Sequence, residues 1–144
     1  MNWLTRHHLF WIATLLLVAL GVYGWWQYHR SPGDMAKTSP AMKVSVAYLV
    51  AKYVKDEPSA NALFLGKLIQ VSGTITDIRF ERDTLVNLLL GEAGAMHQVS
   101  CLMDKQSNPA IRRLAAGKPV IIKGICTGFL MDVELNRCVI VTPR

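Results

Sequence analysis

The sequence predicts a mainly β domain of five strands that follows a single membrane helix. Three observations support this prediction. An uncharged run of eighteen residues, 9–26, lies near the N-terminus. Beyond Gly66, apolar and polar residues alternate with a period of two, which is the pattern of half-buried strands. A short helical segment, 109–117, then separates three predicted strands from two more.

The uncharged run is long enough for a membrane helix. About 20 helical residues cross the hydrocarbon, and the aromatic residues Trp25, Trp26 and Tyr28 stand where an interfacial belt is expected. A buried core helix and a cleaved signal peptide are the alternatives. Cleavage requires small residues before the cut, and the run ends instead in bulky ones. The sequence therefore predicts an uncleaved anchor over residues 1–29.

The orientation of the anchor is predicted from its flanks. The Lys/Arg balance slightly favours an exported N-terminus, because Arg6 precedes the run and Arg30, Lys37 and Lys43 follow it. Short single anchors at the N-terminus nevertheless commonly export the domain on their C-terminal side. We therefore expect a single-pass protein of the bacterial inner membrane, with its N-terminus cytoplasmic and its C-terminal domain periplasmic.

Residues 30–43 have a linker composition, with two prolines and a glycine, and the domain is predicted to span 44–144. An amphipathic helix follows the linker, because apolar residues recur there at helical spacing. Pro58 marks a break, and a short helical turn comes next. The apolar residues expected to face the core are Val46, Ala47, Val50, Tyr53 and Val54 in the helix, and Ala62, Leu63 and Leu65 in the turn.

The first strand is predicted in 68–78, where Ile69, Val71, Gly73 and Ile75 alternate with polar residues. Two more strands are predicted at 84–90 and 97–103, and two at 119–126 and 133–141. Between them, Pro109 stands at the first position of a short helix. Three strands, a helix and two strands are the order of the five-stranded OB barrel. An open sheet with a helical cover is the alternative.

Several positions carry a family resemblance, which covers about Val44 to Val141. They are Gly66, Lys67, Val71 and Gly73, then Gly117, Val120, Ile122, Gly124 and Cys126, and finally Asp132, Val133, Leu135 and Cys138. In these positions the chain resembles the tRNA-anticodon-binding-like OB-fold family of bacterial envelope proteins. The resemblance implies an OB fold and an envelope location. It supplies no catalytic residues, because a fold does not convey a function.

Two cysteines suggest a covalent link. Cys126 and Cys138 lie six residues on either side of Asp132, so a symmetric hairpin would bring them together as a disulfide. Such a bond persists only in an oxidising compartment. Cys101 is expected on the third strand beside the fifth, which makes Cys101 with Cys138 the competing pair. Three buried, reduced thiols are the remaining alternative.

A possible ligand or nucleic-acid surface comprises residues of the loop after the first strand and of the short helix. These are Arg79, Phe80, Arg82, Arg112 and Arg113. The net charge of +6 suits an anionic partner, but the charges are scattered. A stacking platform for single strands needs several aromatic residues, and only Phe80 and Phe129 follow Gly66. The sequence therefore disfavours nucleic acid.

No catalytic motif is present, and we expect neither an enzyme nor a cofactor. A metal site is not expected, because no CxxC occurs. We expect His97 to be a strand residue facing solvent, and Asp132 and Glu134 to be turn and surface residues. The predicted function is a binding or assembly module for an envelope protein or a small ligand. The alternative is a membrane-tethered OB module that binds single-stranded nucleic acid.

Overall fold

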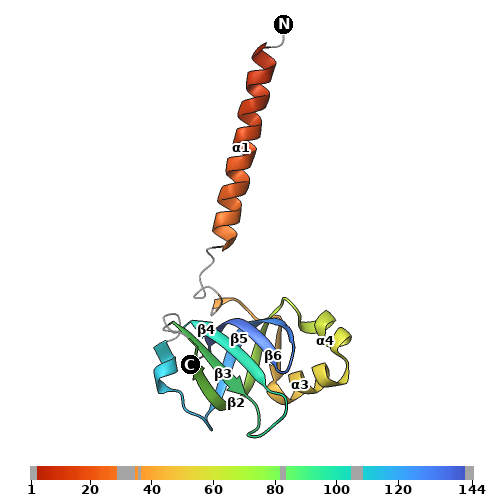
Figure 1. The fold of residues 1–144 in the computed structure, drawn as a ribbon, viewed down its shortest axis with the longest axis vertical. Helices are drawn as coiled ribbons and strands as arrows, with labels where there is room; N and C mark the ends of the chain where they lie inside the picture. The colour runs from red at the N-terminus through yellow and green to blue at the C-terminus, as the bar shows by residue number, and fades with distance from the viewer. Residues whose placement is uncertain (1–2, 29–34, 36, 82–83, 105–108, 142–144) are drawn as a thin grey trace. The chain divides into compact units, whose positions relative to one another are not determined.

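The computed structural model describes residues 3–28, 35, 37–81, 84–104 and 109–141. The chain divides into two compact units, Met1–Ser31 and Pro32–Arg144, and each is considered by itself (Figure 1). The first unit holds the helix α1, Trp3–Tyr28. The second unit holds all the strands and the remaining helices.

Apolar side chains point outward on every side of α1. Side chains are described there for residues 11–25, and all of them are exposed. The successive residues Leu15, Leu16, Leu17 and Val18 surround the helix, because neighbours in a helix are about 100° apart. Across the described residues, no helix has both the length and the apolar character needed to span a membrane. The membrane helix therefore stays a prediction.

The second unit is a closed barrel of five strands. They are β2 (Leu68–Phe80), β3 (Leu85–Leu90), β4 (Val99–Asp104), β5 (Pro119–Phe129) and β6 (Val133–Ile140). The order is β2-β3-β4-β6-β5, and pairing of β5 with β2 closes the barrel. The β4–β6 pair is parallel and the other barrel pairs are antiparallel. The predicted mainly β fold with a five-stranded OB barrel is confirmed.

A sixth strand, β1 (Met42–Ser45), was not expected. Met42 and Lys43 belong to it, although the sequence places them in the linker. It pairs in parallel with residues 69–72 of β2, whereas β3 pairs only with 75–80. Strand β1 therefore covers the part of the β2 edge that β3 leaves open. Without it, the N–H and C=O groups of that edge would be unpaired. Lys123 Nζ also donates to the carbonyl of Thr38 just before it, at 3.2 Å.

Two helices precede the barrel, α3 (Val46–Lys55) and α4 (Glu57–Phe64). Side chains of Ser45 and Asp56 cap them. The predicted break between the two helices falls at Asp56, and Pro58 lies just after it in the first turn of α4. The buried faces agree with the predicted ones only in part, because Val46 and Tyr53 are buried as predicted and Val50 packs against the core. The residues that face the core are Val46, Leu49 and Tyr53 in α3, and Ala60 and Phe64 in α4, whereas Ala47, Val54, Ala62, Leu63 and Leu65 are exposed.

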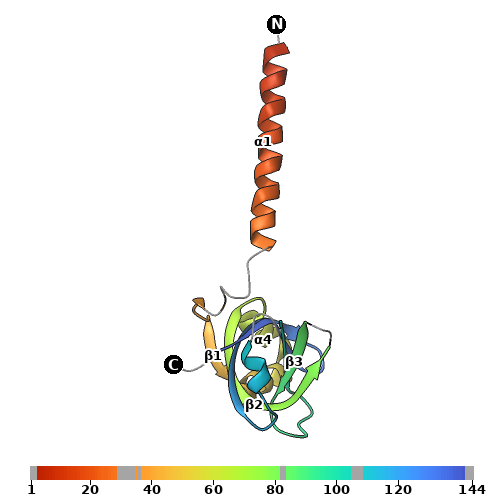
Figure 2. The ribbon, with the colours of Figure 1, turned by 90° about the vertical axis from the view of Figure 1, so that its left-hand side faces the viewer.

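The core fills the barrel and reaches under α3. The predicted alternation in β2 is confirmed, because Ile69, Val71 and Ile75 are fully buried. Gly73 on the same strand lies so close to α3 that an added Cβ would overlap Cγ2 of Val46. One end of the barrel is covered by α3 and α4, and a 3₁₀ turn, η1 (Pro109–Arg113), lies across the other end (Figures 1 and 2).

Candidate functional site

The end of β2 presents different side chains on its two faces. Successive strand residues point to opposite faces, so Asp77 and Arg79 share one face while Ile78 and Phe80 share the other. Arg79 Nε contacts Asp77 Oδ2 at 2.9 Å, and the Ile78 amide donates to Asp77 Oδ1 at 2.8 Å. The hydrogen bond from Arg79 lowers the pKa of the Asp77 carboxyl. Arg79 is therefore already paired with an acid on the face opposite Phe80.

The turn η1 presents its residues in three directions. A 3₁₀ helix has three residues per turn, so Ile111 and Leu114 lie above one another and point into the barrel end. Ile111 is buried in the core, and the partly buried Leu114 packs against that core. Arg112 and Arg113 occupy the other two directions, on opposite flanks of that apolar ridge. The amide of Gly117 donates to the carbonyl of Ile75 at 2.7 Å, which fixes the segment after η1 against β2.

These two elements form a pocket that we call the Phe80–Arg112 pocket. It has a volume of about 560 Å³ and is lined by Ile78, Phe80, Ile111, Arg112 and Leu114. Its floor is aliphatic, and the Phe80 ring on its rim is 65% exposed. A guanidinium beside an accessible aromatic ring suits a ligand that joins an anionic group to a planar or apolar body.

The five residues predicted for a ligand surface do not form one site. Phe80 and Arg112 meet in the pocket. Arg113 instead lines a neighbouring cavity of about 600 Å³ beside β2 and β5, which shares Leu114 with the Phe80–Arg112 pocket. Arg79 lies on the outer face of the barrel, and Arg82 lies outside the described residues. Ile78 and Leu114 were not among the residues predicted for this surface. The two-residue period of a strand places Ile78 on the same face as Phe80, and the three-residue period of a 3₁₀ helix places Leu114 above Ile111.

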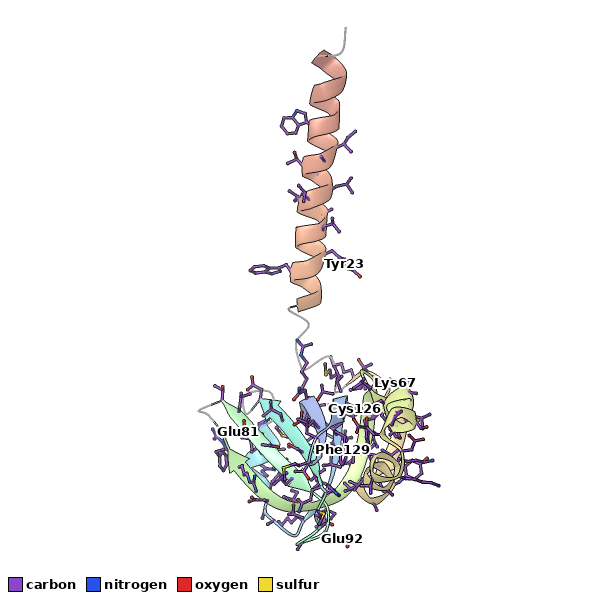
Figure 3. The ribbon with its side chains drawn as sticks, turned by 45° about the vertical axis from the view of Figure 1, so that its right-hand side comes forward. Tyr23, Lys67, Glu81, Glu92, Cys126 and Phe129 are labelled. Carbon is purple, nitrogen blue, oxygen red and sulfur yellow. The ribbon has the colours of Figure 1, made fainter. Side chains whose placement is uncertain are left out.

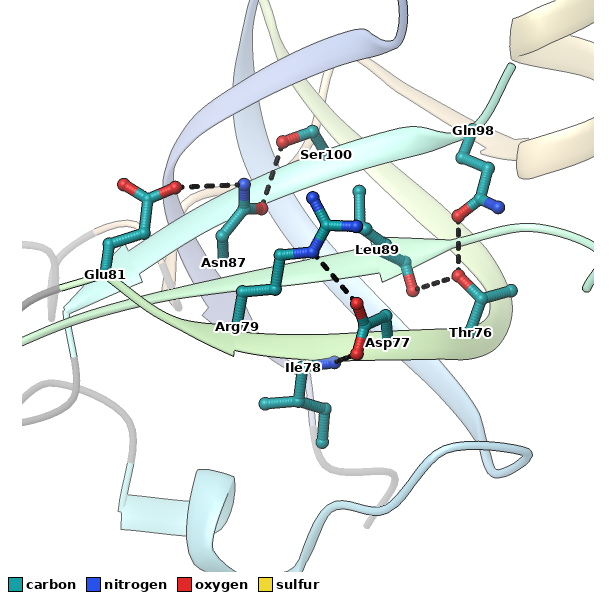
Figure 4. Close-up of polar contacts among 9 residues, drawn as sticks. All are labelled: Thr76, Asp77, Ile78, Arg79, Glu81, Asn87, Leu89, Gln98 and Ser100. Atoms are coloured by element: carbon teal, nitrogen blue, oxygen red, sulfur yellow. Dashed lines mark hydrogen bonds and ion pairs between the residues drawn. The ribbon is translucent and has the colours of Figure 1, made fainter. Parts of the chain in front are cut away.

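The outer face of β2, β3 and β4 is the usual oligonucleotide face of an OB barrel. Here it carries a chain of polar contacts (Figure 4). Asn87 Nδ2 donates to Glu81 Oε1 at 3.4 Å, Ser100 Oγ donates to Asn87 Oδ1 at 3.0 Å, and Thr76 Oγ1 donates to the carbonyl of Leu89 at 3.1 Å. Neither β3 nor β4 contains an aromatic residue.

Among the described residues, acidic groups outnumber basic ones on this outer face and on the neighbouring strand β6. Strand alternation and exposure place there the carboxylates of Asp77, Glu81, Asp104 and Glu134 and the guanidinium groups of Arg79 and Arg137. Phosphate binding requires an excess of basic groups, because nucleic-acid affinity comes chiefly from Lys and Arg side chains that contact the phosphate backbone of the nucleic acid. The described outer face is therefore poorly suited to a nucleic-acid strand.

Two loops are fastened together at the base of β6. The Gln98 amide donates to Asp132 Oδ1 at 2.7 Å, and His97 Nδ1 contacts the carbonyl of Met131 at 2.7 Å. The His97 ring also packs edge-on against Phe129, at 5.5 Å between centroids. His97 is thus a half-buried loop residue that joins two loops, and not the solvent-facing strand residue predicted. Asp132 is likewise more than a turn residue, because its carboxylate accepts a hydrogen bond from the Gln98 amide in another loop.

The predicted Cys126–Cys138 disulfide does not form in the structure. All three cysteines are buried thiols. Cys126, which is labelled in Figure 3, lies opposite Leu135 across the β5–β6 pair. Its sulfur is 3.2 Å from the phenol oxygen of Tyr53. Cys138 lies farther along β6, where its thiol donates to the carbonyl of Leu135 at 3.3 Å. Irregularities in the hairpin register explain the error, because Cys126 and Cys138 are not symmetric about the turn.

The described residues contain no group of three His, Cys, Asp or Glu side chains that could hold a metal ion. The Phe80–Arg112 pocket is the candidate binding site that we consider. A closed five-stranded barrel with a short helical turn after its third strand defines an OB-fold domain. The chain belongs to the tRNA_anti-like family, whose model matches residues 1–140.

Three solved structures that match this chain are 14–20% identical to it. A "putative nucleic acid-binding lipoprotein" from Klebsiella pneumoniae superposes with a TM-score of 0.58 at 15% identity, over 71% of this chain and 93% of that one. An aspartyl-tRNA synthetase from Entamoeba histolytica gives 0.44 at 14% identity, over 74% of this chain and 26% of the other. The S. pombe Stn1–Ten1 complex gives 0.39 at 20%, over 48% and 52%. No curated protein matches the chain. The Klebsiella pneumoniae structure bears on the fold of this chain alone.

Proposed function

We propose that this OB domain is a binding module without catalytic activity, and that its ligand occupies the Phe80–Arg112 pocket. The observation that carries the proposal is the convergence of an exposed aromatic ring, a guanidinium group and an aliphatic floor in one pocket. Its volume of about 560 Å³ falls within the range of small-ligand sites, roughly 300–1,000 Å³. The ligand is a small molecule with an anionic group on an apolar or planar body.

The charges of the pocket support an anionic ligand. Arg112 is the charged residue among those lining the pocket, and Arg79 on the opposite face of β2 is paired with Asp77. A carboxylate, sulfonate or phosphate on the ligand would pair with the planar guanidinium through two hydrogen bonds. The Phe80 ring and the aliphatic floor would then contact the apolar part of the same ligand.

Binding of single-stranded nucleic acid is the second candidate. Membership of the tRNA_anti-like family and the accessible Phe80 ring beside a cation favour it. The acidic outer face and the absence of aromatic residues from β3 and β4 oppose it. An oligonucleotide would have to bind at the end of the barrel, where a single exposed ring offers one stacking position.

The binding module is further proposed to be anchored in a bacterial inner membrane, with the barrel on the periplasmic side. The sequence supports this through the uncharged run from Leu9 to Trp26, and helix α1 carries exposed apolar residues all round. Protease added to spheroplasts should digest the barrel while leaving a cytoplasmic marker intact. A barrel that stays protected until the cells are lysed would overturn the proposed orientation.

The ligand proposal is tested by NMR titration of the full chain in mild detergent. Naphthalene-2-sulfonate serves as the probe because it joins one anionic group to one planar body. The methyl signals of Ile78, Ile111 and Leu114 should shift and saturate, whereas methyls of β3 should not. Unmoved signals at these three residues would overturn the proposal. A ten-residue oligothymidine forms the second arm. Stronger, salt-sensitive shifts with that strand would favour nucleic acid instead.

A further inference from the structure

Helix α3 is apolar around more of its circumference than the core covers. Its buried residues form a stripe about 60° wide, at 100° per residue. A second apolar stripe continues from this one through about a further 140° of the helix. The second stripe comprises Ala47, Val50, Ala51 and Val54. Val50 is half-buried and the other three are exposed, so the core of this domain does not account for the apolar character of the second stripe.

A groove of about 540 Å³ runs along the second stripe. We call it the α3 groove. It lies between α3, residues 72–74 of β2 and the loop 91–97, and all four residues of the second stripe line it. The sequence predicted Ala47 and Val54 to face the core, and the groove gives their apolar character another explanation. Its volume falls within the range of small-ligand sites, roughly 300–1,000 Å³.

The walls of the α3 groove are held in place by contacts within the domain. Because Gly73 has no Cβ, α3 packs closely against β2. The amide of Gly91 donates to the carbonyl of Thr74 at 2.9 Å, which fixes the start of the loop against β2. His97 Nδ1 lies 2.7 Å from the carbonyl of Met131 and fixes its end. A ligand would therefore enter a groove that is already formed.

His97 offers the groove a hydrogen-bond acceptor. A carbonyl oxygen has no proton to give, so Nδ1 must donate in its contact with Met131. In a neutral imidazole the other nitrogen, Nε2, then carries a lone pair. The ring is also held by its edge-on packing against Phe129. His97 lines the groove, so its acceptor is available to a ligand there.

Glu92 is the charged residue among those that line the α3 groove. Its side chain is exposed, and within the described parts of the chain no hydrogen bond or ion pair engages its carboxylate. The ammonium group of Lys52 lies instead over the ring of Tyr48, outside the second stripe. Hydroxyl groups in the groove can donate or accept, so they do not decide the charge of a ligand. The loop wall thus offers a carboxylate and an imidazole acceptor.

We propose that the α3 groove is a second binding site, and that it takes a small apolar ligand carrying an ammonium group. The apolar body of the ligand lies along Val50 and Val54. Its ammonium group donates to the carboxylate of Glu92 and to Nε2 of His97, which are acceptors that a protonated amine requires. The site has the opposite charge preference to the Phe80–Arg112 pocket and does not depend on it.

The site is tested by NMR titration of the full chain in mild detergent with 2-naphthylmethylamine. The matched neutral probe is 2-naphthylmethanol, which has the same body without the charge. The amine should shift the methyl signals of Ala47, Val50, Ala51 and Val54 to saturation, and should bind about tenfold more tightly than the alcohol. The Nε2 signal of His97 should move as well. Unmoved methyls, or equal affinity for the two probes, would overturn the proposal.

Replacement of Glu92 tests the ammonium contact. Glu92→Gln should weaken binding of the amine about tenfold and leave binding of the alcohol unchanged. Glu81→Gln is the control, because Glu81 is an exposed acid that lies well apart from Glu92 (Figure 3). It should bind both probes as the wild type does. Equal effects of the two substitutions on amine binding would contradict the assigned contact.

A larger side chain in the groove tests the place of the apolar body. Ala51→Leu should block both probes, because the added atoms fill the groove at an exposed helix position that tolerates leucine. Ala62→Leu adds the same atoms on the exposed side of α4 and should leave binding intact. Undiminished binding in Ala51→Leu would overturn the site. Shifts of the groove methyls on dilution of the free protein would show that a second copy covers the groove, which would also overturn it.

The two binding sites can be told apart in the same spectra. The amine should leave the methyl signals of Ile111 unmoved, and naphthalene-2-sulfonate should leave those of Val54 unmoved. Loss of sulfonate binding with retained amine binding would remove the Phe80–Arg112 pocket alone. The reverse result would remove the α3 groove alone.

Discussion

The phenol oxygen of Tyr53 lies 3.2 Å from the sulfur of Cys126, so α3 and β5 meet through a polar contact inside the core. Burial, followed by this hydrogen bond, raises the pKa of Tyr53 far above its ordinary value. In the unfolded chain the phenol ionises near its usual pKa of about 10. Above that pH the unfolded state holds fewer protons than the folded state, so the free energy of unfolding must fall as pH rises.

The contribution of Tyr53 to the pH dependence of the unfolding free energy can be removed by substituting phenylalanine. Between pH 9 and 11 the unfolding free energy of Tyr53→Phe should fall less steeply than that of the wild type, by up to about 1.4 kcal/mol per pH unit above pH 10. Urea titrations at a series of pH values measure both slopes. Tyr48→Phe is the matched control, because Tyr48 is half exposed on the same helix. Equal slopes for Tyr53→Phe and the wild type would contradict the assigned contact.

Gly73 allows α3 to approach β2. An alanine there would place its Cβ against Cγ2 of Val46, and the Leu90 Cβ lies at 3.6 Å on the other side. We expect Gly73→Ala to lower the unfolding free energy by about 1–3 kcal/mol, the range for overpacked sites. Combining it with Val46→Ala removes the overlapping methyl. The double variant should lose clearly less than the sum of the two single losses, measured by urea unfolding. Additive losses would show that the two residues are not in conflict.

The carboxylate of Asp132 fastens the turn before β6 to the loop before β4. Asp132→Ala leaves the Gln98 amide without its 2.7 Å acceptor, and we expect a loss of about 1–2 kcal/mol. Asp132→Asn retains an acceptor oxygen and should lose less. Amide exchange at Gln98 is the local measurement, since it should accelerate strongly in the alanine variant. Unchanged exchange there would mean that the carboxylate does not hold the loop.

The barrel could be predicted because its signals are local and periodic. Alternation in β2 identifies Ile69, Val71 and Ile75 as inward residues, and all three are buried. Pro109 and Gly117 bracket the turn between the third and fourth barrel strands, where η1 begins at Pro109 and Gly117 has a φ of 83°. Strand β1 could not be found in this way. Four residues give too short a pattern, and the open edge of β2 that they cover is a property of the assembled sheet.

The candidate site was predicted only in part, because sequence proximity does not decide which face a residue takes. Arg79 and Phe80 are adjacent but lie on opposite faces of β2, and Arg112 and Arg113 diverge by the three-residue period of η1. The cysteine pairing failed for a related reason. A left-handed residue, Arg137, shifts the alternation in β6 just before Cys138, and no pattern in the sequence announces it.

The adjacent arginines of η1 offer the most direct test of the Phe80–Arg112 pocket. Arg112→Gln and Arg113→Gln remove the same charge from exposed neighbours in one turn, so they match in composition and net charge. Binding of naphthalene-2-sulfonate to the full chain, followed through the Ile111 methyl signal, should weaken about tenfold in Arg112→Gln, as expected for losing a charge-assisted contact. Arg113→Gln should bind as the wild type does. Equal weakening in both variants, or a larger effect at Arg113, would contradict the assignment of the site.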